Sequence, residues 1–173
     1  MNTFVALLLF AGLVAVIIFV QKIIGTTLNA VAKTANKNVL YRSEFKEGQE
    51  LVSESLSFET SASINQVMAA LKSAVTVAQI RTVLPTIYES SRSENCVTYA
   101  YGSSLTPKLF EAVVELTGHN ATTGGRFVIL SWKENDGLVS ALDAMKKLRR
   151  QVRAGFAAAD SNVKVQTISS HAG

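Results

Sequence analysis

The stretch LVSALDAMKKLRRQVRAGFAAA, residues 138–159, carries the strongest periodic pattern in the chain. Its apolar side chains recur every three or four residues, the spacing that gathers them on one side of an α-helix. They are Leu138, Leu142, Met145, Leu148, Val152, Phe156 and Ala159. We therefore predict a long amphipathic helix, capped at its start by Asn135 or Asp136 and ended by residues 160–162.

Four short segments ahead of this helix alternate between apolar and polar residues, as half-buried antiparallel strands do. They cover residues 86–90, 96–102, 108–117 and 126–133. Residues 91–95, 103–107 and 118–125 are typical of turns, and residues 163–168 predict one more short strand. The clearest face unites Phe110, Ala112, Val114 and Leu116. An antiparallel sheet is therefore the predicted layer under the amphipathic helix.

Further toward the N-terminus, residues 51–60 alternate as a first strand, and residues 64–75 follow the helical period. Ser61 or Ser63 is a suitable N-cap for that helix. Residues 78–84 could form a second short helix, whereas residues 39–50 are polar and predict a linker. The fold class predicted from these patterns is α+β, with an antiparallel sheet packed against a long C-terminal amphipathic helix.

This order of elements resembles the START-like, helix-grip superfamily, which includes polyketide cyclases and lipid-binding proteins. The opening SESLSFETSASINQVMAAL, residues 53–71, resembles its first strand and helix, and WKENDGLVSALDAMKKLRRQVRAGF, residues 132–156, its last strand and helix. The resemblance covers residues 50–160 and rests on element order alone. It implies a curved sheet around the last helix and an apolar pocket between them, or a core filled by side chains. It implies no catalytic residue.

An unbroken apolar run, FVALLLFAGLVAVIIFV, occupies residues 4–20. As a helix it measures ~25 Å, close to the hydrocarbon core of about 30 Å, and Thr3, Ile23 and Ile24 can extend it. No ionisable side chain interrupts the run. We therefore predict a single-pass anchor in the cell membrane over residues 1–24, a stalk or linker over 25–49, an α+β domain over 50–168 and a disordered tail over 169–173.

A cleaved signal peptide is the main alternative to the anchor, because Ala30-Val31-Ala32 resembles a cleavage site. Against it, the first three residues lack Lys and Arg, and the apolar run is longer than usual for a signal peptide. Lys22, Lys33, Lys37 and Arg42 follow the run. The positive-inside rule therefore predicts a cytoplasmic domain.

The predicted C-terminal helix carries a basic face, which consists of Lys146, Lys147, Arg149, Arg150 and Arg153. Such a face could contact anionic lipid headgroups, or it could be an ordinary solvated helix side. Nothing aromatic is interleaved with it, so nucleic acid is not a predicted partner. The net charge of +4 agrees with that reading.

No catalytic, cofactor-binding or metal-ligating residue is predicted. The chain has one cysteine, Cys96, and two histidines, His119 and His171, too few for a His/Cys zinc site. Glu111 and Glu115 share a strand face and are best read as exposed acidic residues rather than a carboxylate pair. The predicted function is therefore a non-enzymatic binding or accessory module for an apolar ligand or a membrane-protein partner.

Two other functions remain open from the sequence. One is a structural assembly subunit resembling a type IV pilin or pseudopilin, which also joins an N-terminal apolar helix to a small α+β domain. The chain lacks the charged leader ending in Gly and the Glu near the start of the apolar run. The other is a membrane-tethered enzyme, for which neither histidine has a flanking signature.

Overall fold

The computed structural model describes residues 41–119 and 122–169. The predicted anchor, most of the stalk, His171 and the end of the tail lie outside these residues. The described residues from Glu44 onward belong to one compact unit. Within the described part of the chain, no helix is both long and apolar enough to cross a bilayer.

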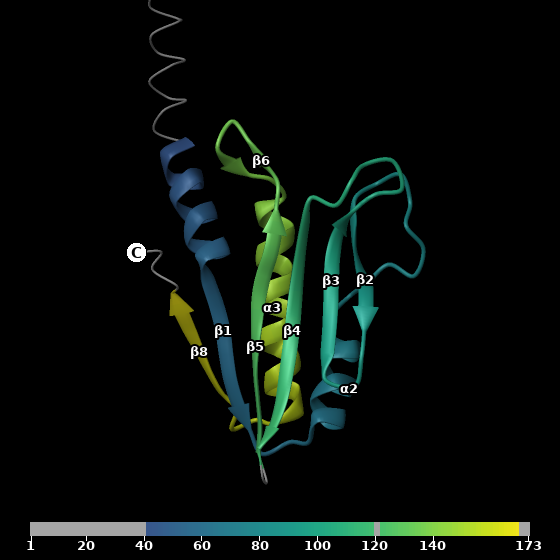
Figure 1. Cartoon of the computed structure of the whole chain (residues 1–173), viewed down its shortest axis with the longest axis vertical. Helices are drawn as coiled ribbons and strands as arrows, with labels where there is room; N and C mark the ends of the chain where they lie inside the picture. Colours follow the sequence, from purple (N-terminus) through teal and green to yellow (C-terminus); the bar gives the residue numbers. More distant parts are fainter. Residues whose placement is uncertain (1–40, 120–121, 170–173) are drawn as a thin grey trace, which may run out of the picture. The chain divides into compact units, whose positions relative to one another are not determined.

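The centre of the unit is a six-stranded sheet in the order β2-β3-β4-β5-β1-β8, and every neighbouring pair is antiparallel (Figure 1). The strands are β1 (Glu54–Thr60), β2 (Thr86–Arg92), β3 (Cys96–Gly102), β4 (Phe110–His119), β5 (Thr122–Trp132) and β8 (Lys164–Ser169). This confirms the predicted α+β class with an antiparallel sheet. The strand of residues 108–117 is confirmed as β4, with all four residues of its predicted apolar face buried.

Two helices, α2 (Ile64–Ala74) and α3 (Leu142–Ala159), cover the inner face of the sheet. Met145, Leu148, Val152 and Phe156 of α3 are at most 1% exposed. The ring of Phe156 stacks on Phe58 of β1 with 3.8 Å between centroids. The α2 helix was predicted correctly, and its capping box joins Ser63 to Gln66.

The long helix begins later than its apolar pattern predicted. Leu138 and Val139 form β7, which pairs with β6 (Glu134–Asn135) in a small hairpin. Asp136 and Gly137 make its turn with positive φ angles of 51° and 79°. Asn135 and Asp136 therefore do not cap α3; its N-cap is Ala141, which makes no side-chain cap bond. Leu138 is half-buried and Val139 is buried. Leu138 therefore continues the apolar spacing of α3 although it lies in a strand.

The prediction of a linker over residues 39–50 is wrong for residues 41–50, because residues 41–53 are helical. Gly48, Leu51 and Val52 are buried, a spacing of three and one that places them on one helix side. Gly48 lies against Val139 of β7, where an added Cβ would come within 3.0 Å of the valine side chain. The buried side of this helix therefore packs against β7, a contact that the polar composition of the segment did not indicate.

Other segments also differ from prediction, and among them β2 runs to Arg92 into the predicted turn 91–95, and β4 covers Phe110–His119 instead of 108–117. Residues 78–84 contain no helix, β1 starts at Glu54 instead of 51, and β5 starts at Thr122 within the predicted loop 118–125. The double glycine Gly124-Gly125 therefore lies in a strand. A strand can continue beyond the residues that alternate between apolar and polar when its backbone has hydrogen-bonding partners on both sides. The β5 strand has them because it lies between β4 and β1.

Candidate functional surfaces

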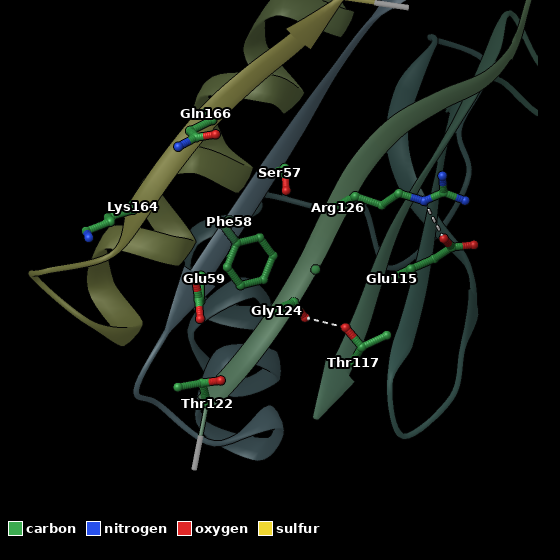
Figure 2. Close-up of a pocket in the computed structure, with 11 residues that line it drawn as sticks. Ser57, Phe58, Glu59, Glu115, Thr117, Thr122, Gly124, Arg126, Lys164 and Gln166 are labelled. Atoms are coloured by element: carbon green, nitrogen blue, oxygen red, sulfur yellow. Dashed lines mark hydrogen bonds and ion pairs between the residues drawn. The ribbon is translucent and has the colours of Figure 1, made fainter. Parts of the chain in front are cut away.

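The outer face of the sheet, opposite α3, is hollowed by a groove of about 830 Å³ over β4, β5, β1 and β8. Figure 2 shows the side chains around it. Its lining residues are Ser57, Phe58, Glu59, Glu115, Thr117, Thr122, Gly124, Gly125, Arg126, Lys164 and Gln166. We call this the outer groove. Most of its side chains are polar or charged.

Strand register arranges the outer groove as two rows across the sheet. In each row, residues on neighbouring strands lie directly opposite one another. The first row consists of Glu115, Arg126, Ser57 and Gln166, and the second of Thr117, Gly124, Glu59 and Lys164. Two acidic and two basic side chains therefore share the groove, so its formal charge is balanced.

Two interactions within the outer groove hold its β4 side (Figure 2). The Arg126 Nε donates to Glu115 Oε2 at 2.7 Å, and the Thr117 hydroxyl donates to the Gly124 carbonyl at 3.3 Å. The Arg126 and Glu115 side chains are 61% and 45% exposed. A partner can therefore reach both charges from solvent.

Two consecutive β5 residues that line the groove lack side chains. Gly124 lies in the outer row between Thr117 and Glu59 and leaves that position of the groove open, whereas Gly125 pairs with Phe58 and faces the inner side. A Cβ on Gly125 would lie 2.4 Å from the Glu115 carbonyl oxygen and 2.7 Å from the Phe58 ring. Gly125 therefore lets Phe58 lie under the strand and reach Phe156. A glycine inside a strand often marks such a close approach, and this was the sequence signal for the groove that our turn assignment missed.

The predicted basic face of α3 is divided by its contacts. Lys146 Nζ lies 2.6 Å from Glu47 Oε1, and Arg149, with a side chain 15% exposed, lies 2.8 Å from Glu54 Oε2. Lys147, Arg150 and Arg153 are exposed and take part in none of the salt bridges among the described residues. Two of the five cations therefore hold the 41–53 helix and β1 to α3, and three face solvent.

A cluster of hydrogen bonds joins the end of α3 to the end of β1. The Asp160 carboxylate accepts from the Thr60 hydroxyl at 2.7 Å, and from the Ser61 hydroxyl and amide and the Asn162 amide at 2.8–3.1 Å. These bonds favour the ionised carboxylate, Thr60 most of all, and they lower the pKa of Asp160 to about 2. The carboxylate therefore serves the fold as a fixed acceptor.

The groups that could support catalysis are scattered or engaged. Glu111 accepts from Lys108 at 2.8 Å, and Glu115 from Arg126, so each carboxylate has its own cation. Cys96 is a free, half-buried thiol, and burial raises the pKa of Tyr99 to about 12. Within residues 41–119 and 122–169, no three His, Cys, Asp or Glu side chains gather closely enough to hold a metal.

No protein family matches the sequence, and no curated protein matches it either. Among solved structures, the chain is similar to protein Ms6760 from Mycobacterium smegmatis, with 10% identity and a TM-score of 0.33. That similarity covers 62% of this chain and 86% of the other.

Proposed function

We propose that this protein is a membrane-anchored, non-enzymatic accessory module whose sheet domain binds a membrane-protein partner through the outer groove. Residues 4–20 provide the anchor, and the positive charges that follow them favour a cytoplasmic domain. The observation that carries the partner assignment is the charge-balanced, solvent-open groove, with Glu59, Glu115, Arg126 and Lys164 around a glycine floor.

The finer fold within this proposal is helix-grip-like. Its support is the strand order β2-β3-β4-β5-β1 with a long α3 lying along the inner face (Figure 1). One feature departs from the superfamily's order with its C-terminal long helix: β8, the strand predicted over residues 163–168, follows α3 and pairs with the free side of β1. That added strand extends the outer groove through Lys164 and Gln166.

A protein partner is favoured over an apolar small molecule by the way the two faces are filled. On the inner face, Phe58, Phe127 and Phe156 are 4%, 1% and 1% exposed, which leaves their rings in contact with protein. On the outer face, polar groups and backbone line the groove, and they suit a polypeptide segment that offers both donors and acceptors. An apolar ligand would leave those groups unpaired.

The pilin-like alternative stays a prediction without a specific structural observation in its favour. In the described residues the helices that cover the sheet are α2 and α3, and neither continues the N-terminal apolar segment. The membrane-tethered enzyme is the least favoured function, because the Glu111 and Glu115 carboxylates are each paired with their own cation and the other reactive groups are scattered.

Site-specific photo-crosslinking in sealed membranes tests the proposal. A benzophenone side chain at Gln166, inside the groove, should yield one adduct of constant mass with a membrane protein, and Arg126→Glu should abolish it. Arg150→Glu reverses a charge of the same kind on the far face and should leave the adduct intact. Adducts that form equally in both variants, or only with lipid, would refute the groove as a protein-binding site.

The location is tested in the same membranes. Protease added outside sealed cells should leave the domain intact, and permeabilised cells should lose it. Alkaline carbonate washing should not release the chain. Digestion in sealed cells would place the domain outside, and release by carbonate would remove the anchor from the proposal.

A further inference from the structure

Four large apolar side chains are exposed on two loops at one end of the sheet. Ile80, Val83, Leu84 and Leu105 are 78%, 64%, 69% and 78% exposed. We call them the apolar tip. Single exposed apolar residues are ordinary on soluble domains, but a group of this kind on adjacent loops is typical of a surface that contacts another apolar phase.

The two loops are fixed to each other by hydrogen bonds. The Ser104 amide donates to the Thr82 carbonyl at 2.8 Å, and its hydroxyl donates to the same oxygen at 3.0 Å. The Arg81 guanidinium donates to the Ser103 carbonyl and lies over the Tyr88 ring, 4.6 Å from its centroid. The loop between α2 and β2 is therefore attached to the loop between β3 and β4.

The second loop is also braced internally. The buried Ser103 hydroxyl accepts from the Leu105 and Thr106 amides at 3.2 and 2.9 Å, and it shares a 2.8 Å hydrogen bond with the Thr106 hydroxyl. These contacts use the polar groups of the loop inside the protein. The apolar side chains are left pointing away from the core, which their exposed fractions record.

Strand directions place the apolar tip at the end of the sheet from which the N-terminal chain leaves. Since neighbouring strands are antiparallel, β1 and β2 begin at the end where β3 and β5 finish. The tip loops precede β2 and follow β3, and the 44–53 helical segment leads into β1. Figure 1 shows these loops and that helical segment at one end of the sheet.

The chain beyond that end contains the apolar run. Residues 21–43 separate residue 20 from the compact unit, a length of 23 residues that spans at most ~80 Å when fully extended. An anchored chain thus keeps this end of the sheet within reach of the bilayer. Trp132, 37% exposed, finishes β5 at the same end, and tryptophan is enriched at membrane interfaces.

We infer that the apolar tip inserts into the interfacial layer of the membrane that anchors the chain, and so holds the sheet end-on to the bilayer. The inference rests on the proposed anchoring, but it uses different residues from the outer groove. End-on contact favours the second interpretation of the basic face, a solvated helix side, since α3 runs from this end of the sheet to the other, where β8 begins. The row of Lys147, Arg150 and Arg153 along α3 would then run roughly perpendicular to the membrane plane and not lie against it.

Depth measurements on the full-length chain test this orientation. In a Cys96→Ser background, single cysteines replace Leu84, Leu105, Glu94 or Arg150, and each carries an environment-sensitive fluorophore. Glu94 lies in the β2–β3 turn, at the opposite end of the sheet, and is exposed. The chains are reconstituted in vesicles of phosphatidylcholine and phosphatidylglycerol, with and without lipids that carry a quencher near the headgroup.

Labels at positions 84 and 105 should show blue-shifted emission and lose intensity to the lipid quencher, whereas labels at 94 and 150 should show neither effect. Water-like emission at 84 and 105 would refute the inference. Quenching at 150 alone would favour side-on contact by the basic face. A third outcome is energy transfer between tip labels on different copies of the chain, which disappears when the protein is diluted with lipid, together with no quenching by the lipid quencher. That outcome would refute the inference and show that the tip contacts a second copy.

Flotation of the same vesicles separates this inference from the anchoring. A chain that fails to float refutes the anchoring and the inference together, whereas a floating chain with water-exposed tip labels refutes the inference alone. As a second variant, Leu84→Ser with Leu105→Ser should abolish the blue shift of a label at Val83. It should leave the unfolding temperature unchanged, because both replaced side chains are already exposed.

Discussion

On the inner face of the sheet, Leu56, Val114 and Phe127 are at most 1% exposed, whereas on the outer face Glu115 and Arg126 keep about half of their side chains in water. Both faces come from the same strands. The inner face contributes stability through burial and close packing, and the outer face presents charges in fixed rows. The fold is therefore held from one side of the sheet, which leaves the other side available for binding.

The largest effect is expected from a change on the inner face. Phe156→Ala removes the ring that stacks on Phe58 and leaves a cavity between α3 and the sheet, so it should lower the free energy of unfolding by about 3–5 kcal/mol. Denaturant unfolding of the full chain in detergent micelles measures the change. Phe156→Leu, which keeps most of the volume, should cost much less, and an equal loss in both variants would contradict the packing argument.

The next effect tests the place where the two faces meet. Gly125→Ala introduces a Cβ against the β4 backbone and the Phe58 ring, and overpacking of this kind costs about 1–3 kcal/mol. Gly124→Ala is the matched control, because its Cβ would meet its nearest atom at 3.5 Å, an ordinary contact. Equal unfolding temperatures for the two variants would show that the position of the Phe58 ring does not depend on the missing side chain at Gly125.

The hydrogen-bond cluster on Asp160 should make stability depend on acid pH. Its folded pKa of about 2 lies below the ordinary value of 3.8, so its contribution is complete above the unfolded pKa and is lost as pH falls through the folded one. Asp160→Asn should therefore lower the unfolding temperature at pH 7, and the difference from the unchanged protein should shrink by pH 2. A difference that is constant with pH would contradict this role of the carboxylate.

The smallest effect is expected on the outer face. Breaking the exposed Arg126–Glu115 pair by Glu115→Gln or Arg126→Gln should change the free energy of unfolding by less than about 1 kcal/mol. A double-mutant cycle measures the coupling, which should fall as salt rises. A coupling as large as the Phe156→Ala loss would mean that the outer face supports the fold, and the contrast between the faces would no longer hold.

Local sequence patterns determined the elements that have one side in the core and the other toward water. The α2 helix, the strands around Val97 and Val114, and the central part of α3 were predictable because a period of two or of 3.6 residues states directly which side is buried. The α+β class follows from their order. The apolar run of residues 4–20 is likewise a property of the sequence alone, whatever the rest of the chain does.

Tertiary structure decided whatever depends on residues far apart in the chain. Residues 41–53 are helical beside β7, Lys146 and Arg149 pair with Glu47 and Glu54, and the groove forms from four strands, β4, β5, β1 and β8, that the register brings together. A local pattern records how a residue meets its neighbours in sequence, but not which distant strand or charge will lie opposite it. For that reason the basic face was visible in the sequence, and its division into structural and solvent-facing cations was not.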